Sequence, residues 1–472
     1  MSEIPALEVS LLAVAGGIFA YVFFVKKPEW GLVVLFLEAI VGGNGRWLEL
    51  LGGTVTPRYI LIVSVAAGFL VRHLVLRQSL AGSYLFLRPL VVFGLVLAVG
   101  VVLALRRGNP DPVSEPQVWL YLLTYFLIVD VYKDKGFPFC LLKVVFVSVA
   151  VMAAITLGMM AAANLNPGRF FAVYLKTPLE AMRITVPWLQ GTHLYYVFWG
   201  NSSLAGLTLC VTVFWISALK RGAEPVLSRR GLKLVGLLSV LTMVFSMTRG
   251  TWGQLVLMAG LLAGSYVLRR RVPLKSVLAA VLLFALGLAA VASVEPLRRG
   301  IVVRASTLLA GESGKLDRSD SIVLKSMETR HLVRAIGARP VLGYGFGIGD
   351  YGEFGEDLKG HSRFHNFFLY FALKTGFVGL LGLLVLLGSF VYAAATAHLK
   401  LRDAWPLSRA LFIGWIFGLA GIAFASLSNP HMGTPAFIAA FALGMAFVDL
   451  AVRRPELASG GGASPSAETS CD

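Results

Sequence analysis

The sequence predicts an all-α, polytopic membrane protein of about 12–13 transmembrane helices, with a large extracytoplasmic loop that contains short interfacial helices. Two observations lead to this fold class. Of the 472 residues, 57% are hydrophobic and only 14% are charged, whereas soluble domains have about 25% charged residues. Apolar runs of about 20 residues recur along the whole chain, and a run of that length crosses the hydrocarbon core as a helix.

The first apolar run follows an N-terminus that lacks a basic region and a small-residue cleavage site, so we expect a retained helix and not a signal peptide. Glycine is abundant, with 50 residues, as expected where membrane helices pack closely. The predicted spans lie near residues 8–25, 30–43, 57–76, 89–105, 117–131, 140–163, 202–219, 233–247, 251–268, 276–293, 377–396, 408–427 and 434–452.

These spans and the polar segments between them divide the chain into five parts. Residues 1–163 form the N-terminal transmembrane helices, and residues 164–293 form a central transmembrane region that begins with a first extracytoplasmic loop. Residues 294–376 form the large extracytoplasmic loop, which we expect to contain helices lying on the membrane face. Residues 377–454 form the C-terminal transmembrane helices, and residues 455–472 form a Gly- and Ser-rich flexible tail.

The net charge is +17. Because the basic residues form short clusters between apolar runs, they indicate the orientation of the helices in the membrane and not binding to nucleic acid. The clusters fall on one side of the predicted spans, which we assign to the cytoplasm. The opposite side then holds 164–201, the Thr248–Thr251 turn, 294–363 and 428–434. Arg106 and Arg107 fall on that opposite side too, against the positive-inside rule. The cytoplasmic clusters are Lys220, Arg221, Arg229, Arg230 and Lys233; Arg269, Arg270, Arg271 and Lys275; Lys400, Arg402 and Arg409; and Arg453 and Arg454.

The first candidate site residue is His365, at the end of the large loop. The residues that follow it have helical spacing of apolar positions, and Gly376 would end this short helix as a left-handed cap. Lys374 would lie in the last turn, where a cation complements the helix dipole. His365 would then lie at the first turn, where a neutral imidazole can accept a proton from an attacking hydroxyl. The alternative is a histidine that caps the helix or anchors it at the interface.

The second candidate is Arg249, which lies in a tight turn between two apolar spans. An arginine at membrane depth is energetically costly and usually has an anionic partner, yet no acidic residue is near it in the sequence. A phosphate ligand fits, because guanidinium binds phosphate through two hydrogen bonds. The alternative is a structural pair with a carboxylate from another part of the fold.

Other motifs are less informative. Arg183 lies ahead of the Gly200-Asn201-Ser202 segment, either as a ligand for substrate or as an interface anchor. The glycine run at 343–349 lacks the Lys-Ser/Thr of a P-loop, so we interpret it as a turn that leads the chain back to the membrane. No His, Cys and carboxylate cluster has metal-ligand spacing, and no metal or cofactor is predicted.

In this order, the motifs resemble those of the O-antigen ligase and Wzy polymerase superfamily of bacterial polysaccharide membrane enzymes. The resemblance covers about the C-terminal two-thirds of the chain. It rests on four segments: Asn201-Ser-Ser-Leu-Ala, Ser246-Met-Thr-Arg249-Gly250, Arg339-Pro-Val-Leu-Gly-Tyr-Gly-Phe-Gly, and His365-Asn366-Phe-Phe-Leu followed by Gly376-Phe-Val-Gly. The family more often has Ser-Arg-Gly where this chain has Thr248-Arg249-Gly250, and a shorter stretch than the one from Arg183 to Asn201.

The resemblance implies a metal-independent, inverting glycosyltransferase of the bacterial inner membrane, with its active site on the extracytoplasmic side. The donor would be a glycan on undecaprenyl pyrophosphate, and the acceptor a sugar hydroxyl. That hydroxyl would lie on lipid A-core for a ligase in lipopolysaccharide biosynthesis, or on another lipid-linked unit for an O-antigen or exopolysaccharide polymerase.

In this reading His365 and Arg249 would be catalytic. The residues implied to bind substrate are Arg183, Arg339, Asn366 and Arg318. Two other classes of protein stay open at this point, a transporter of lipid-linked glycans and a non-catalytic scaffold. The transporter is the less favoured, because transporters usually place charged sites at the midplane, whereas spans 202–219, 233–247 and 276–293 carry no charge between their ends.

Overall fold

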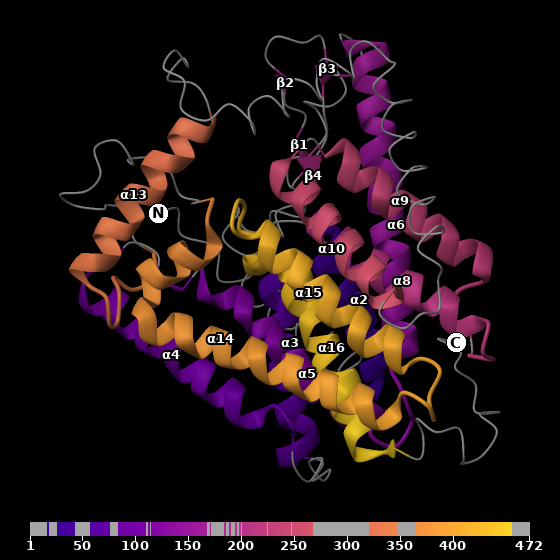
Figure 1. Cartoon of the computed structure of the whole chain (residues 1–472). Helices are drawn as coiled ribbons and strands as arrows, with labels where there is room; N and C mark the ends of the chain where they lie inside the picture. Colours follow the sequence, from indigo (N-terminus) through magenta and orange to yellow (C-terminus); the bar gives the residue numbers. More distant parts are fainter. Residues whose placement is uncertain are drawn as a thin grey trace.

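The structure is a computed structural model, and its described part is helical apart from four two-residue strands (Figure 1). The all-α fold class is therefore confirmed. The described residues are 17, 26–42, 57–75, 84–109, 112–113, 115–167, 170, 184–185, 188–189, 194–195, 198–199, 201–223, 225–246, 248–267, 321–347 and 365–455.

Most helices agree with the predicted spans to within a few residues; α14 begins ten residues before the span predicted at 377–396, and α13 lies in the large loop. Only the spans predicted at 8–25 and 276–293 lie outside the described helices, so the predicted total stays a prediction. The helices are α2 (Pro28–Val41), α3 (Pro57–Leu70) with η2 (Val71–Val75), α4 (Leu87–Arg106), η3 (Pro116–Leu122) with α5 (Leu123–Tyr132), α6 (Phe139–Leu165), α8 (Ser203–Leu219), α9 (Arg229–Phe245), α10 (Arg249–Val267), α13 (Ser321–Ala338), α14 (Phe367–Leu401), η6 (Arg409–Ile413) with α15 (Gly414–Ala425), η7 (His431–Gly433) and α16 (Pro435–Arg453).

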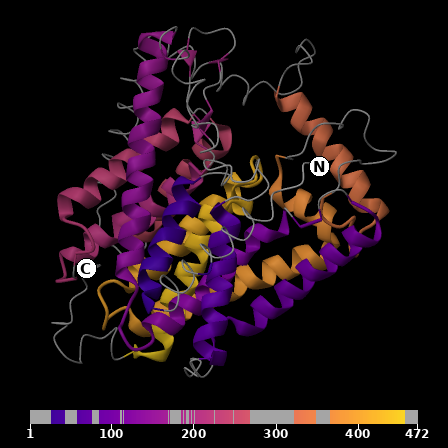
Figure 2. The ribbon, with the colours of Figure 1, turned by 180° about the vertical axis from the view of Figure 1, so that it is seen from behind.

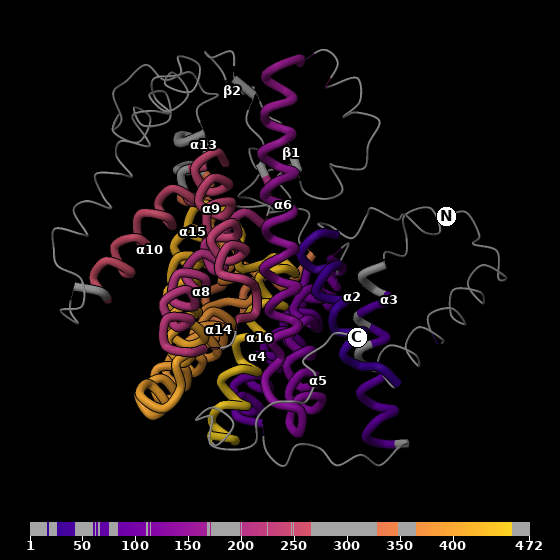
Figure 3. The backbone as a smooth tube through the Cα atoms, turned by 90° about the vertical axis from the view of Figure 1, so that its right-hand side faces the viewer, coloured from indigo at the N-terminus to yellow at the C-terminus, as the bar shows by residue number. Residues whose placement is uncertain are grey.

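Within the described residues, four helices are long and apolar enough to cross a membrane, namely α4, α6, α14 and α16. Helix α16 lies at the centre of the bundle, since 94% of its most apolar window is buried (Figure 1). Helix α4 lies at the periphery, since only 17% of its window is buried. A helix that is apolar on its exposed faces is expected to face lipid. Helix α6 packs between α2 on one side and α8 and α9 on the other (Figure 3).

Helices α4 and α14 form an antiparallel pair, and this pair positions much of the candidate site. Phe86 near the start of α4 lies 6.3 Å, between ring centroids, from Phe390. Phe93, further along α4, lies 6.0 Å from Phe371 near the start of α14. The end of α4 is thereby placed beside the start of α14. Helix α13, from the large loop, rises from that end of the pair (Figure 2), which confirms that the loop contains a helix.

The four strands between α6 and α8 were not predicted. They are β1 (Ile184–Thr185), paired antiparallel with β4 (Phe198–Trp199), and β2 (Trp188–Leu189), paired antiparallel with β3 (Leu194–Tyr195). Two-residue strands are too short to produce an alternating pattern in the sequence. The aromatic residues of this segment nevertheless have high strand propensity.

Candidate functional site

One turn joins the segments that carry the two predicted catalytic residues. This α15–α16 turn comprises residues 426–434. The backbone N–H of Phe367, at the start of α14, donates to the carbonyl of Ser426 at 2.9 Å. Gly250, at the start of α10, packs on the same turn so closely that a Cβ would overlap the Ser428 hydroxyl. The start of α10 and the start of α14 therefore meet at one end of the bundle.

Arg249 is the first residue of α10, directly before the closely packed Gly250. The helix begins at the predicted turn, because the carbonyl of Thr248 accepts from the N–H of Trp252 at 3.1 Å. The tight turn between α9 and α10 is thereby confirmed. The side chain of Arg249 lies outside the described part of the structure, as do Arg183 and Arg318 altogether.

His365 lies two residues before α14 and not in its first turn, which corrects the predicted position. Helix α14 begins at Phe367 because Asn366 is its N-cap. The Asn366 side chain accepts a hydrogen bond from the N–H of Leu369 at 3.1 Å. Asparagine is among the most favourable N-cap residues. The structure thus gives Asn366 a capping role, and its predicted contact with substrate stays a prediction.

A carboxylate from the large loop holds His365. Glu328, on α13, accepts a hydrogen bond from the backbone N–H of His365 at 2.5 Å through Oε1. Its Oε2 lies 2.7 Å from the imidazole Nδ1. The Glu328 side chain is 12% exposed and that of His365 is 44% exposed. One edge of the imidazole is therefore fixed, while the ring remains accessible.

Apolar packing between α13 and α14 places Glu328 beside His365. Leu332, Ala335 and Ile336 of α13 are buried against Ala372 and Leu373 of α14. Glu328 precedes Leu332 by one helical turn, so it lies on the same face of α13 as these apolar residues. The face of α13 that packs on the membrane helix is therefore also the face that carries the carboxylate.

Gly376 ends the short first segment of α14, as predicted, and the second segment continues at an angle. Its φ of 67° has the positive sign expected of a cap, but its ψ of −172° is extended and not left-handed helical. The reason is that the N–H groups of the next two residues bond to residues 340–341 and not to carbonyls of the preceding helical turn. Phe377 N–H donates to the Pro340 carbonyl at 2.7 Å, and Val378 N–H donates to the Val341 carbonyl at 3.2 Å. This combination of φ and ψ is nearly exclusive to glycine.

The glycine run forms a turn against α14, as predicted. Gly343, Gly345 and Gly347 all have positive φ. The N–H groups of Tyr344 and Gly345 donate to the carbonyls of Leu373 and Lys374, at 2.9 and 2.8 Å. A Cβ on Gly345 would lie 2.6 Å from the backbone nitrogen of Ala104 in α4. The run therefore fits into the space where α4 ends and α14 bends.

Two arginines lie beside the ring of Tyr344 in this turn. The guanidinium carbons of Arg339 and Arg107 lie 4.8 Å and 5.9 Å from the ring centroid. Arg107 also donates to the carbonyl of Gly343 at 3.0 Å. Partial desolvation and, secondly, the charge of Arg339 lower the pKa of Arg107, although a guanidinium stays charged at any physiological pH. Two positive charges side by side favour an anion between or beside them.

Lys374 differs from its predicted role. Its side chain is only 1% exposed, and its Nζ lies 3.1 Å from Glu115 Oε1, on the chain just before η3. Tyr370 donates to the same oxygen at 2.7 Å. The charge of Lys374 is therefore matched by a carboxylate from another segment and does not simply complement the helix dipole.

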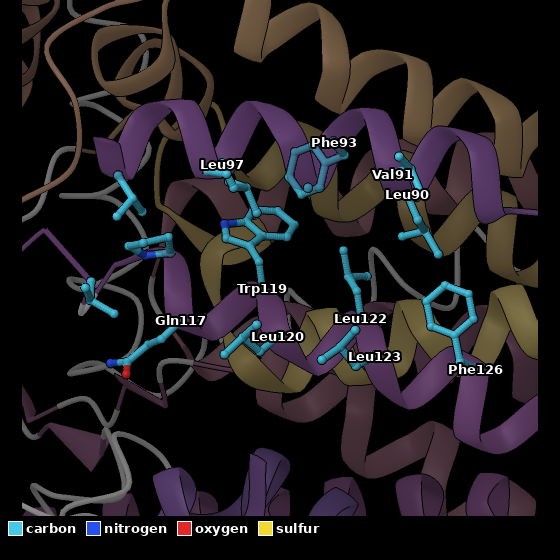
Figure 4. Close-up of a pocket in the computed structure, with 15 residues that line it drawn as sticks. Leu90, Val91, Phe93, Leu97, Gln117, Trp119, Leu120, Leu122, Leu123 and Phe126 are labelled. Carbon is cyan, nitrogen blue, oxygen red and sulfur yellow. The ribbon is translucent and has the colours of Figure 1, made fainter. Parts of the chain in front are cut away.

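An apolar groove of about 430 Å³ runs between α4 and the η3–α5 segment. Figure 4 shows side chains from both walls directed into it, with Gln117 as the polar residue among the labelled ones. Leu120 and Leu123 on one wall and Val91 on the other are each more than one-third exposed. Such a surface is suited to lipid chains. Other residues of its walls are Leu90, Phe93, Leu97, Trp119, Leu122 and Phe126.

Among the described residues, no group of three or more His, Cys, Asp or Glu side chains could hold a metal ion. His365 and Glu328 form a pair, and the charged groups described above around the first segment of α14 are Arg107, Arg339, Lys374 and Glu115. In its described part, the site thus offers a histidine, a carboxylate and guanidinium groups.

Comparison with protein families identifies residues 234–384 as an O-antigen ligase domain, Wzy_C. This match supports membership of the O-antigen ligase/polymerase superfamily. The matched region runs from α9 into α14 and includes Arg249, α13, the glycine run and His365. No curated relative matches the chain.

The sequence reasoning missed the contacts of three polar residues in this part of the molecule. They are Glu328, Arg107 and Glu115. A signal existed for Glu328, because it is an acid one turn ahead of an apolar helical face in an otherwise basic segment. Arg107 was noted only as an exception to the positive-inside rule, and nothing local distinguishes Glu115. Their partners lie 236 and 259 residues away.

Proposed function

We propose that this membrane protein is a metal-independent, inverting glycosyltransferase. It would move a glycan from undecaprenyl pyrophosphate to a sugar hydroxyl, as an O-antigen ligase does, on the extracytoplasmic side of the bacterial inner membrane. Membership of the superfamily implies lipid-linked glycan substrates in general. The specific donor, the reaction and the orientation are proposals that rest on the site.

The observation that carries this proposal is the meeting of α10 and α14 at the α15–α16 turn. Gly250 directly follows Arg249, Phe367 lies two residues after His365, and both contact the same short turn. Two reacting groups can act on one substrate only if they are held within a few ångströms of it. A base at His365 and a cation at Arg249 would thus face one substrate from two helix ends.

In the proposed reaction, Nε2 of His365 takes the proton of the acceptor hydroxyl. The acceptor oxygen forms a bond to the anomeric carbon from the face opposite the pyrophosphate, which inverts the configuration. The bond between the anomeric carbon and the phosphate oxygen breaks, and its electron pair stays on the pyrophosphate. Arg249 stabilises the charge that grows there.

Arg339 and Arg107 would bind the distal part of the same anion or a phosphate of the acceptor. Along the short first segment of α14, Tyr344 lies beside Leu373, seven residues from Asn366. Seven helical residues span about 10 Å. Arg339 and Arg107 would therefore lie too far from His365 to contact the bond that breaks, but close enough to bind a phosphate next to it. The roles of Arg183, Arg318 and Asn366 in substrate binding stay part of the proposal.

The lipid tail of the donor would lie in the apolar groove between α4 and α5. The groove opens where lipid-facing side chains are exposed, and it leads along α4 toward the end that carries Arg107. A long isoprenoid cannot leave the bilayer without a large hydrophobic cost, at about 0.8 kcal/mol per CH₂. A site at the membrane surface with a lateral apolar groove avoids that cost.

The test is glycan transfer from a purified undecaprenyl-pyrophosphate-linked donor in proteoliposomes. We expect His365→Ala to abolish transfer and Arg249→Lys to lower it strongly, because an ammonium cannot form the paired hydrogen bonds of a guanidinium. Arg402→Lys, at an exposed position at the other end of α14, is the matched control. EDTA should have no effect. Normal transfer by His365→Ala would reject the proposed role of the histidine.

Deletion of the gene separates ligase from polymerase. Polymer that accumulates but is absent from lipid A-core indicates a ligase, and accumulation of single repeat units indicates a polymerase. The transporter alternative predicts a different outcome, namely that the purified protein has no transferase activity. It is disfavoured by the position of the charged groups, because Arg107 and Arg339 lie directly after the ends of α4 and α13, and His365 lies before the start of α14.

A further inference from the structure

We propose that Glu328 is a positioning residue that fixes the tautomer of His365, so that Nε2 carries the lone pair that accepts the acceptor's proton. This inference rests on the proposed function, in which His365 is the base. Glu328 itself touches no substrate in this scheme. It acts through the imidazole, from a helix of the large loop.

The geometry gives the carboxylate two donors from one residue. Oε1 accepts the backbone N–H of His365 at 2.5 Å, and Oε2 lies 2.7 Å from Nδ1. An ionised carboxylate can only accept hydrogen bonds, so the proton of a neutral imidazole must be on Nδ1. Nε2 is then unprotonated. The bond to the backbone N–H fixes the position of the carboxylate relative to the ring, so that rotation of the imidazole would break a charge-assisted hydrogen bond.

The surroundings fit a positioning role better than a structural ion pair. The Glu328 side chain is 12% exposed, whereas that of His365 is 44% exposed. Within the described residues, no hydrogen-bond partner faces Nε2. The polar edge of the imidazole that faces the protein is therefore satisfied, and the edge that faces outward is available to a substrate hydroxyl.

Helix α13 holds the carboxylate in place through apolar contacts with α14. Leu332, one turn after Glu328, is 1% exposed and packs with Ala372 and Leu373. The same α14 segment begins with the Asn366 cap directly after His365. Both partners are therefore fixed to one rigid element, as an orienting carboxylate requires.

The decisive experiment compares Glu328→Gln with Glu328→Ala. The glutamine amide can still accept the backbone N–H through its oxygen, but it presents an NH₂ donor to Nδ1. The imidazole proton must then move to Nε2, which removes the base. In Glu328→Ala, water can reach Nδ1 and both tautomers become accessible. We expect the near-isosteric glutamine variant to transfer glycan at least about 10²-fold more slowly than wild type, and more slowly than the alanine variant.

A structural role for Glu328 predicts the reverse order, because glutamine conserves shape and alanine leaves a gap. Alanine slower than or equal to glutamine would therefore overturn the inference. Glu328→Asp, which keeps the carboxylate, should restore much of the activity that glutamine loses. Asp403→Asn is the matched control, because it neutralises an exposed carboxylate at the other end of α14, away from His365.

A measurement without transfer separates this inference from the proposed function. The ¹⁵N spectrum of histidine-labelled protein in bilayers reports each tautomer, and the His365 signal is found by subtracting the spectrum of His365→Gln. We expect Nδ1–H in wild type and in Asp403→Asn, and Nε2–H in Glu328→Gln. An unchanged tautomer in Glu328→Gln overturns the inference. A changed tautomer with undiminished transfer rejects His365 as the base, and the positioning role falls with the proposed function, although Glu328 then still sets the tautomer.

Discussion

Replacing Gly376 by alanine should detach the glycine run from α14 and thereby disorganise the site. The residue has φ 67° and ψ −172°, which is nearly exclusive to glycine. A Cβ would also overlap the Val341 carbonyl and lie 2.5 Å from the backbone nitrogen of Leu342. Both neighbours are backbone atoms, so no side chain can rotate away and the two segments must separate.

The cost can be worked out from the two hydrogen bonds that hold this junction. Phe377 N–H and Val378 N–H donate to the carbonyls of Pro340 and Val341 at 2.7 and 3.2 Å. Each lost backbone bond costs about 0.5–1.5 kcal/mol, and alanine at this φ and ψ costs about 1–3 kcal/mol. The total destabilisation is about 2–6 kcal/mol. Because α13 packs on the same segment, Glu328 should shift from His365, and a displacement of 1 Å can lower a rate by about 10²-fold.

The assay measures the thermal midpoint of the purified protein together with glycan transfer in proteoliposomes. Gly388→Ala is the matched control on the same helix, because a Cβ at Gly388 meets nothing within 4 Å. That control should keep wild-type transfer and lose no stability, since alanine is favoured over glycine within a helix. If Gly376→Ala matched Gly388→Ala in both measurements, the junction would not support the site.

Two further substitutions test the surroundings of the site. Glu115→Gln should destabilise the protein by about 2–3 kcal/mol, more than Lys374→Met does, because it leaves the buried Lys374 ammonium unpaired, whereas the Glu115 carboxylate is 28% exposed. In thermal denaturation, the double variant should recover most of the stability that Glu115→Gln loses. Additive losses would contradict the pairing. Gly94 lines the groove, and a Cβ there would meet nothing within 4 Å, so Gly94→Leu should fill the groove. We expect this variant to slow transfer from an undecaprenyl donor more than from a short-chain donor, whereas Gly388→Leu should slow neither. Equal slowing of both donors would exclude the groove as the site of the lipid tail.

The membrane helices could be predicted from the sequence because each is determined locally. An apolar run of sufficient length forms a helix in a bilayer wherever it lies, since every backbone group must be hydrogen-bonded. Helix α6 was predicted at 140–163 and extends over Phe139–Leu165. Helix α16 was predicted at 434–452 and extends over Pro435–Arg453. Errors at the ends arose where a side chain decides the boundary, as Asn366 does for α14.

The site was only partly predictable because its polar contacts join residues that are distant in the sequence. His365 could be singled out from a helical pattern that begins near it, but its partner Glu328 lies 37 residues earlier. Lys374 was assigned to the helix dipole because Glu115, its actual partner, is 259 residues away. Local spacing predicts which face a residue occupies, whereas the partner on that face depends on tertiary packing. A buried charged side chain, such as that of Lys374, needs an opposite charge, so the sequence can predict that a partner exists even where it cannot predict which residue it is.

The position of Arg107 also explains an exception to the predicted topology. With Arg106, it lies at the end of α4 that the arrangement of spans assigns to the extracytoplasmic side, where basic residues are disfavoured. The structure places Arg107 against the Gly343 carbonyl and the Tyr344 ring, so it lies at the same end of the bundle as the large loop. The bias against basic residues is statistical and modest per residue. A specific contact with the loop is sufficient reason for an arginine there.

The glycine run has a consequence for how an anion can bind. Glycine-rich loops bind phosphate through exposed backbone N–H groups. Here the N–H groups of Gly343, Tyr344 and Gly345 are already donated to the carbonyls of Arg339, Leu373 and Lys374, so none of these three is available to a ligand. These three residues therefore fix the backbone from which Arg339 projects and leave an anion beside Tyr344 to the guanidinium groups of Arg339 and Arg107. The glycines are needed because the turn fits between two helices, and the arginines supply the donors that the backbone of residues 343–345 no longer has.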